Sequence, residues 1–381
     1  MKKKIAFLYV WANPPIRQSV EQMLLEAFPE YEIEPIGIGK MLKDRIHLMA
    51  LNELEVARYY GLDILRGQKK HAEFVVATPF LFHQARKMVL EQLKSKSADY
   101  AFTFQLQSLF DTSLPAIPHF IYTDRTVLSN LAYPDFDPHN LYAPDWIKLE
   151  KTIYQNASLV FVRSSYICRS LIEDYQCPPE KAVCVYAGSN SHLREENFNL
   201  SRYSQKNILF VGVNWRLKGG PELEQAFRLV LERHPDASLT IIGSAPKIDL
   251  PQVQVLGYVP LADLPPYYEN ASIFCLPTRY EAFGVAYIEA MENSLPIVAT
   301  NLGAIPDFVI EGENGHLVQS GNVQAIANAL LDLLDSPARC RAFGGKSRSI
   351  YLDRYNWKNT GNLIRENVLN TLQSRAPINA A

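Results

Sequence analysis

Two glutamates separated by seven residues flank a glycine where a strand gives way to a helix. The segment 276–293 reads LPTRYEAFGVAYIEAMEN, with Glu281 in the loop, Gly284 at the helix start and Glu289 within the helix. Glycine permits close backbone approach, and a helix N-terminus presents unpaired N–H groups and a positive dipole end, so the segment favours an anion-binding site. The spacing alone supports a second interpretation equally well, in which Glu281 is a loop acid and Glu289 a solvated helix residue.

A second segment combines glycines with two cations. Residues 208–220 read ILFVGVNWRLKGG, so a strand runs into Gly212, a loop carries Arg216 and Lys218, and Gly219-Gly220 leads into a helix. This order favours a diphosphate cradle, in which arginine offers a bidentate fork and lysine a point charge. It matches neither the P-loop nor the GxGxxG pattern. The alternative is a strand–helix loop with ordinary surface cations.

The elements that must position these segments repeat in two halves. Short apolar runs alternate with segments of helical periodicity, which predicts parallel βαβ units. A polar stretch at 189–206 is the expected linker, and the tail at 374–381 is expected to fray. In the first half we expect strands at 5–10, 74–77, 100–104, 119–122 and 159–162, and helices at 20–27, 48–65 and 81–93. In the second half we expect strands at 207–211, 238–242, 253–256, 273–276, 296–299 and 315–318, and helices at 221–233, 284–293, 323–334, 338–351 and 358–372.

This alternation predicts an α/β protein with two doubly wound parallel-sheet (Rossmann-like) domains facing a central cleft. The first domain covers 1–195 and is joined by the C-terminal helix 356–381, and the second covers 206–355. Ligands of such sheets bind beyond the carboxyl ends of the strands.

Composition excludes several classes of protein. With 381 residues, 48% hydrophobic and 20% charged, the chain is neither disordered nor a single small domain. The net charge of −2 argues against a nucleic-acid partner. The five cysteines show no zinc-site pairing, so we expect free, buried thiols. Lys2–Lys4 and the apolar run 5–12 resemble a short signal peptide but are better interpreted as the first strand, which predicts a cytoplasmic protein.

The residues quoted above carry a resemblance to a known family. FVGVNWRLKGG, together with the E-x7-E pair Glu281 and Glu289 between LPT and LPIVAT, is similar to the retaining glycosyltransferases of the GT-B fold, specifically family 4. The resemblance is sharpest over about 120 residues of the second half. It implies that 1–195 bind an acceptor and that 206–355 bind a nucleotide-sugar donor.

The resemblance also implies roles for individual residues. Lys218 would neutralise the diphosphate, Glu281 would bind hydroxyls of the transferred sugar, and Glu289 would bind the ribose hydroxyls. The remaining donor-binding positions that it implies are Gly212, Arg216 as a weaker helper, Tyr258 beside the nucleobase, and the backbone at Phe283, Gly284 and Val285.

The chain departs from the family pattern at three places. Val213 stands where many members carry an arginine, and Arg216 is the nearest replacement. The N-domain position that often holds a histidine facing the donor sugar holds Asp124, while His119 lies at the start of that strand. Asp124 would contact a sugar hydroxyl or the acceptor, or else cap the following turn. Residues 303–307, GAIPD, replace the more usual Gly-Gly-x-x-Glu.

A metal site is not expected. Asp135 and Asp137 match a DxD motif, but they lie in a proline-rich loop with no strand before it, which favours solvated turn acids. The histidines show no ligand spacing. We therefore expect no cofactor and no metal, and the nucleotide sugar acts as a co-substrate.

The implied activity is transfer of a sugar from a UDP- or GDP-linked donor to a sugar, lipid-linked or small-molecule hydroxyl, with retention by a front-face mechanism. The alternatives are a nucleotide-sugar epimerase of the same architecture and a non-catalytic nucleotide-sugar-binding protein. We expect a monomer or a homodimer. The first 100 residues hold 15 Lys and Arg against 12 Asp and Glu. This balance is consistent with two interpretations: a solvated surface of mixed charge, or transient contact with the inner face of a membrane.

Overall fold

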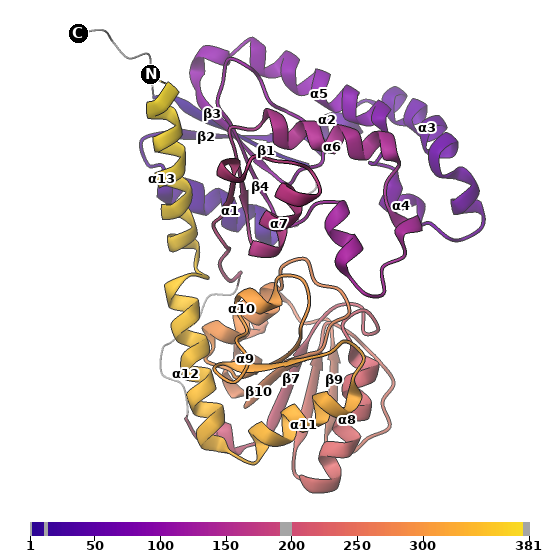
Figure 1. Ribbon diagram of the computed structural model, residues 1–381, viewed down its shortest axis with the longest axis vertical. Helices are drawn as coiled ribbons and strands as arrows, with labels where there is room; N and C mark the ends of the chain where they lie inside the picture. Colours follow the sequence, from indigo (N-terminus) through magenta and orange to yellow (C-terminus); the bar gives the residue numbers. More distant parts are fainter. Residues whose placement is uncertain (1, 11–13, 191–199, 376–381) are drawn as a thin grey trace. The chain divides into compact units, whose positions relative to one another are not determined.

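The computed structural model of the chain describes residues 2–10, 14–190 and 200–375. It divides the chain into two compact units (Figure 1). One unit comprises Met1–Tyr186 and Thr360–Ala381, and the other comprises Ala187–Asn359. Most of the expected linker, residues 191–199, and the tail from 376 lie outside the described residues.

The first unit is built on a six-stranded parallel sheet of order β2-β1-β3-β4-β5-β6. The order reverses between β1 and β3, as in doubly wound folds. The strands are β1 (Lys4–Tyr9), β2 (Glu32–Gly37), β3 (Tyr100–Leu106), β4 (His119–Thr123), β5 (Leu159–Val162) and β6 (Ala182–Cys184). The helices are α1 (Pro14–Ala27), α2 (Ile38–Lys43), α3 (Ile46–Leu65), α4 (His71–Phe74), α5 (Pro79–Lys94), α6 (Pro144–Asn156), α7 (Ser165–Glu173) and most of α13 (Trp357–Arg375).

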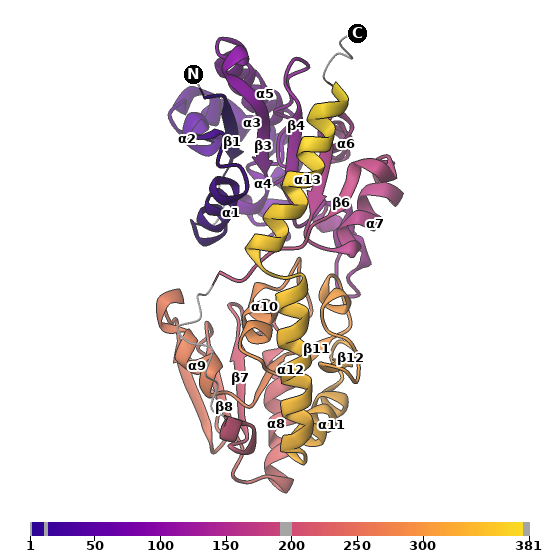
Figure 2. The same ribbon diagram turned by 90° about the vertical axis from the view of Figure 1, so that its left-hand side faces the viewer.

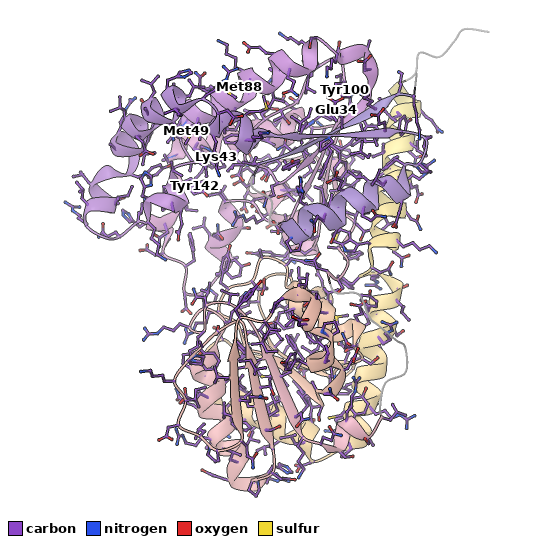
Figure 3. All side chains as sticks on the ribbon, turned by 180° about the vertical axis from the view of Figure 1, so that it is seen from behind. Glu34, Lys43, Met49, Met88, Tyr100 and Tyr142 are labelled. Carbon is purple, nitrogen blue, oxygen red and sulfur yellow. The ribbon has the colours of Figure 1, made fainter. Side chains whose placement is uncertain are left out.

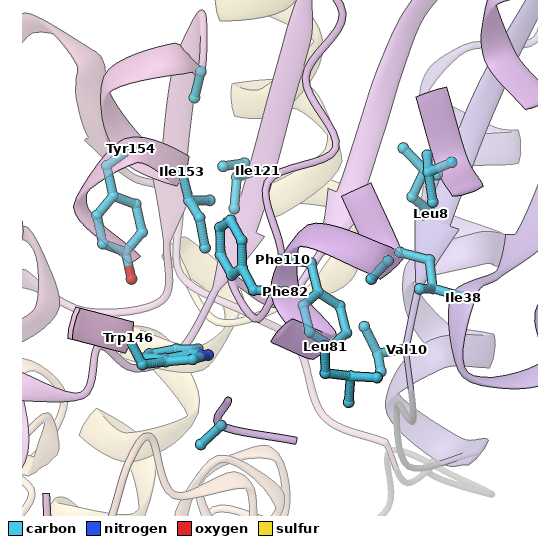
Figure 4. Packing of buried hydrophobic residues seen from close by; sticks show 14 of the residues in the cluster. Leu8, Val10, Ile38, Leu81, Phe82, Phe110, Ile121, Trp146, Ile153 and Tyr154 are labelled. Atoms are coloured by element: carbon cyan, nitrogen blue, oxygen red, sulfur yellow. The ribbon is translucent and has the colours of Figure 1, made fainter. Parts of the chain in front are cut away.

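Both faces of this sheet are covered by apolar side chains. One face packs against α2, α3, α5 and α6 and forms a hydrophobic core with them. Figure 4 shows the packing of this core around Phe82, Phe110 and Trp146. The other face carries a row of rings in which Phe104 and Phe120 each stack on Phe161. Fully buried parallel strands read as continuous apolar runs, which is why β1, β3, β4 and β5 could be predicted.

α13 returns the chain to the first unit beside α1 (Figure 2). A Cβ on Gly361 would lie 3.2 Å from Met23 and 3.3 Å from Ala27, so a glycine allows the two helices to approach closely. The Arg365 guanidinium donates to the Ala27 carbonyl at 2.7 Å and pairs with Glu30.

The strand expected at 74–77 is wrong, because Phe74 ends α4 and the following residues form a turn. The segment is apolar because it is buried, but its N–H groups bond within the turn and its carbonyls accept from side chains rather than from a neighbouring strand. Asn52 donates to the Val75 carbonyl and Tyr60 to the Ala77 carbonyl, both at 2.7 Å.

β2, an edge strand, was not predicted. Among the described strands it pairs with β1 alone, and its Glu34 accepts hydrogen bonds from Lys4 and Tyr100; Figure 3 labels Glu34 and Tyr100. Acids and a proline hide the strand pattern at such an edge. β6, a second edge strand, is only three half-buried residues long and was also missed.

The second unit holds another six-stranded parallel sheet, of order β12-β11-β10-β7-β8-β9. Here the order reverses between β7 and β10, the dinucleotide-binding pattern. Helix α8 packs against α11, and α10 against α12. The strands are β7 (Asn207–Val211), β8 (Ser238–Ile242), β9 (Val253–Gly257), β10 (Ile273–Leu276), β11 (Ile297–Thr300) and β12 (Gly315–Val318). The helices are α8 (Gly220–Arg233), α9 (Pro265–Asn270), α10 (Val285–Glu292), α11 (Val323–Leu334) and α12 (Pro337–Asp353).

The cysteines are free thiols. Cys177, Cys275 and Cys340 are buried as expected, whereas Cys168 and Cys184 are half-buried. Among the described residues, no helix combines the length and the apolar character that crossing a bilayer requires.

Candidate functional site

The loop after β7 and the loop after β10 pack directly on each other. Gly219 has φ 73°, and a Cβ there would lie 1.8 Å from the Pro277 carbonyl oxygen. Only glycine fits this position, because both its backbone conformation and the contact exclude a side chain. Gly219 of the glycine pair therefore allows the two loops to approach, whereas Gly220 lies against the Trp215 ring of its own loop.

Hydrogen bonds then fix these loops together. The N–H of Arg279 donates to the Leu217 carbonyl at 2.9 Å, and the Thr278 hydroxyl contacts the same carbonyl at 3.2 Å. The Arg279 guanidinium also pairs with Glu222 on α8. Each contact joins the β7–α8 segment to the β10–α10 segment.

At this junction the Lys218 ammonium donates to the Glu281 carboxylate at 2.7 Å and to the Tyr280 carbonyl at 3.3 Å. Both charged side chains are largely withdrawn from solvent, with 18% and 14% of their surface exposed. They follow β7 and β10, the two strands between which the sheet order reverses. Ligands of doubly wound sheets bind beyond the carboxyl ends of strands at such a switch point. The pair therefore occupies the expected place for a ligand in this unit.

Helix α10 begins immediately after the Glu281 loop. Its N-cap is Gly284, at φ 103°, and a Cβ there would lie 2.6 Å from the Tyr287 ring. The first N–H groups of a helix have no helical partners and carry partial positive charge. Val285 is the first helical residue and is half-buried, whereas the Phe283 ring packs edge-on against Phe308 in the core. Phe283 can therefore offer only its backbone to a ligand.

Glu289 lies within α10 and is buried, so it is not a solvated helix residue. The Tyr268 hydroxyl on α9 donates to its carboxylate at 2.8 Å. Burial raises the pKa of Glu289 to about 7, although this hydrogen bond acts in the opposite direction. The structure thus gives Glu289 a protein partner on α9, and its role toward a ribose stays a prediction.

Three other residues predicted to bind the donor lie in loops of the same unit. Gly212 directly follows β7, and a Cβ there would come within 3.1 Å of the Lys218 side chain. Arg216 is exposed on the turn that precedes Lys218. Tyr258 follows β9 and is 82% exposed, so its ring is open to a ligand rather than part of the core.

In the first unit, Asp124 follows β4 and pairs with Arg163 at 3.0 Å. Arg163 is buried and lies over the Tyr122 ring, 5.0 Å from its centroid. The sequence suggested a ligand contact or a turn cap for Asp124 and missed this ion pair, because Arg163 lies 39 residues away.

His119 is buried at the start of β4 and shares a 2.7 Å hydrogen bond with Thr103. Burial lowers the pKa of His119 to about 4, so the ring is neutral near pH 7.

A buried carboxylate that sequence reasoning missed holds the loop after β4. Glu150 accepts the Val127 N–H at 3.1 Å and the Tyr154 hydroxyl at 2.9 Å, and it also accepts from Tyr175. Burial raises the pKa of Glu150 to about 7, against these hydrogen bonds. The four-residue spacing of Glu150 and Tyr154 was the only signal available, since the other partners are distant in sequence.

The DxD aspartates behave as turn residues. Asp137 caps a 3₁₀ turn at Pro138–Asn140 by accepting the His139 N–H at 2.9 Å. Within residues 2–10, 14–190 and 200–375, no three His, Cys, Asp or Glu side chains gather in a way that could hold a metal ion.

Comparison with known proteins gives a family for part of the chain. Residues 205–336 match the family described as Glycosyl transferases group 1. A GDP-mannose-dependent alpha-(1-6)-phosphatidylinositol monomannoside mannosyltransferase of Mycolicibacterium smegmatis is 31% identical over 167 residues, 39% of this chain and 44% of the relative. A D-inositol 3-phosphate glycosyltransferase of Corynebacterium aurimucosum is 27% identical over 55% of this chain and 56% of the relative. The chain thus spans about half the length of the curated relatives it matches.

Solved structures match nearly the whole chain. A glycosyltransferase from Rickettsia africae aligns with a TM-score of 0.65 at 14% identity, over 98% of this chain and 100% of the other. Anabaena Alr3699/HepE, in complex with UDP and glucose, aligns with a TM-score of 0.61 at 15% identity, over 96% and 99%. These likenesses confirm the predicted GT-B fold.

Proposed function

We propose that this chain, whose residues 205–336 form a domain of the Glycosyl transferases group 1 family, transfers a sugar from a nucleoside-diphosphate sugar to a hydroxyl acceptor. The observation that carries the proposal is the Lys218–Glu281 pair, 2.7 Å apart at the point where the second sheet reverses its order. A cation at that point can bind a diphosphate, and a carboxylate beside it can accept hydrogen bonds from the hydroxyls of an attached sugar.

The donor groups of Lys218 support its role. An ammonium has three N–H donors, and here one faces Glu281 and another the Tyr280 carbonyl. The third can donate to a phosphate oxygen while Glu281 keeps its place. Glu281 retains acceptor capacity for sugar hydroxyls, because a carboxylate has about four lone-pair sites.

We propose that the start of α10 completes the phosphate site through backbone N–H groups near Gly284 and Val285. Arg216 and Tyr258 would approach the donor from the exposed loops, with Tyr258 beside the base. Glu289 would bind the ribose, and Asp124 a sugar or acceptor hydroxyl.

The proposed reaction is a front-face substitution with retention. The bond from the anomeric carbon to the phosphate oxygen breaks with its electron pair going to the phosphate, and the acceptor oxygen bonds to the same face. The acceptor's proton passes to the departing phosphate oxygen. Lys218 and α10 stabilise the charge that grows on that phosphate, so the mechanism needs no protein nucleophile and no metal ion.

A panel of donors tests this function in two stages. One relative's name specifies GDP-mannose and a solved neighbour holds UDP and glucose, so UDP- and GDP-sugars are screened by thermal shift. A donor at 100 times its dissociation constant adds about 2.7 kcal/mol of stability. The chosen donor is then incubated with hydroxyl acceptors, and nucleoside diphosphate release and the anomeric configuration of the product are measured.

Acceptor-dependent release with retention supports the proposal. Conversion of the donor without an acceptor would indicate an epimerase, and binding without turnover a sensor. We place the protein in the cytoplasm or at the inner face of a membrane, as a monomer or a homodimer.

A further inference from the structure

Helix α3 (Ile46–Leu65) is apolar on two opposite sides. Its inner side buries Leu48, Asn52, Val56 and Tyr60, spaced four residues apart. The helices that pack against α3 are α2, α4 and α5, along one side of it (Figure 1).

The outer side of α3 carries leucines in solvent. Leu51, Leu54, Leu62 and Leu65 are 48%, 68%, 69% and 85% exposed. At 100° per residue, these positions lie roughly opposite the buried row. An exposed helix face of a soluble unit is normally polar, so an apolar stripe of this length indicates an interaction surface. We call these four leucines the α3 stripe.

Charge around the α3 stripe is biased toward cations. The acidic side chains of the helix form ion pairs: Glu55 with Arg58, Asp63 with Lys69 and Glu53 with His71. Arg58 is exposed on the outer side among the leucines, and its partner Glu55 is half-buried at the edge of that side.

Exposed cations also flank both ends of the helix. Lys40, Lys43 and Arg45 precede it and Arg66 follows it, with Asp44 as the one exposed acid among the first group (Figure 3 labels Lys43). None of these four cations forms an ion pair with any residue that the structure describes.

We propose that the α3 stripe docks on an anionic lipid surface, with the helix parallel to the membrane plane. The leucines would enter the interfacial layer while the flanking cations contact lipid phosphates. The helix cannot span the bilayer, because Glu53, Glu55, Arg58 and Asp63 interrupt it. This inference stands on the first unit alone and does not depend on the proposed sugar transfer.

A second copy of the chain fits this surface less well. A two-fold contact places the same patch on both partners, so an antiparallel pair of α3 helices would bring Lys43 and Arg45 of one copy near Arg66 of the other. Like charges then oppose one another at both ends of the contact.

Vesicle cosedimentation of the full chain tests the proposal, without donor or acceptor present. The vesicles are phosphatidylcholine alone or with about 30% phosphatidylglycerol. We expect the chain to bind the anionic vesicles. Salt at 0.5 M should weaken this binding, because it shortens the screening length to roughly 4 Å. The double variant Leu54→Glu/Leu62→Glu should partition at least ~10-fold less. Lys43→Gln/Arg66→Gln should lose most of the preference for anionic lipid.

The matched control is Leu352→Glu, an exposed leucine of α12 in the second unit, which should bind as the wild type does. Unchanged thermal unfolding shows that the double variant is folded. The proposal is overturned if the double variant binds vesicles as well as the wild type. It is also overturned if the wild type ignores anionic vesicles; a dimer in sedimentation equilibrium that the double variant dissociates would then identify a second copy as the partner. A chain that binds vesicles but transfers no sugar would refute only the proposed function.

Discussion

Replacing Lys218 by alanine should slow sugar transfer by about 100-fold. The ammonium lies 2.7 Å from Glu281 with little solvent around it, so its bond to a phosphate oxygen would form in a poorly hydrated site. A charge-assisted hydrogen bond contributes about 1.5–3 kcal/mol, which corresponds to roughly 10- to 150-fold in rate. The loss should appear mainly in kcat, because the charge on the phosphate grows as the bond breaks.

The same substitution also leaves the Glu281 carboxylate without its counterion, so it should lower the free energy of unfolding by about 1–3 kcal/mol. A double-mutant cycle separates the two effects. Lys218→Ala, Glu281→Gln and the double variant are compared by steady-state kinetics and by urea unfolding, with Lys206→Ala as the control. Lys206 pairs with Asp236 in the same unit, before β7 begins.

In the double variant no unpaired carboxylate remains, so stability should recover, but turnover should stay as low as in Lys218→Ala. If the double variant turns over as fast as Glu281→Gln alone, Lys218 acts only through Glu281, and its role toward the phosphate is refuted.

Three further perturbations have defined outcomes. Because the pKa of Glu289 is raised to about 7 from an ordinary value of 4.5, the folded state holds its proton more tightly. The free energy of unfolding should therefore fall as pH rises from 4.5 to 7, and Glu289→Gln should flatten that fall in urea titrations while raising the donor KM. Gly219→Ala should lower the free energy of unfolding by about 2–4 kcal/mol in urea titrations, against about 1 kcal/mol for Gly312→Ala, because Gly312 has a similar φ but open space around it. Equal losses in the two variants would show that the contact between the loops does not contribute to stability. Asp124→Asn should lower the melting temperature by stranding the buried Arg163, and an unchanged melting curve would contradict that pairing.

The second unit was predictable in nearly all its elements. Its strands are apolar because they are buried on both faces, and its helices carry clear periodicity between them. Lys218 and Glu281 could be chosen from their loops, since βα loops of such sheets gather at one edge. Their direct contact could not, because it depends on the packing of Gly219 against a loop about 60 residues later.

The first unit shows what the pattern misses. The edge strand β2 holds two glutamates and a proline within six residues, which hide its strand pattern, and the turn after α4 is apolar only because the core covers it. Arg163 carries no local signal, and Glu150 carries only its four-residue spacing from Tyr154, since burial and long-range hydrogen bonds determine their roles. The exposed stripe of α3 was likewise invisible, because periodicity gives two apolar faces without saying which one is covered.

The central claim is that the second unit binds a nucleoside diphosphate through Lys218 without a divalent ion. Isothermal titration of UDP and GDP in the presence of EDTA tests it most directly. The account predicts that one of them binds, that its monophosphate binds more weakly, and that Lys218→Ala reduces the diphosphate affinity by at least ~10-fold. Equal affinity of the wild type and Lys218→Ala for the diphosphate, or binding that vanishes with EDTA, would contradict it.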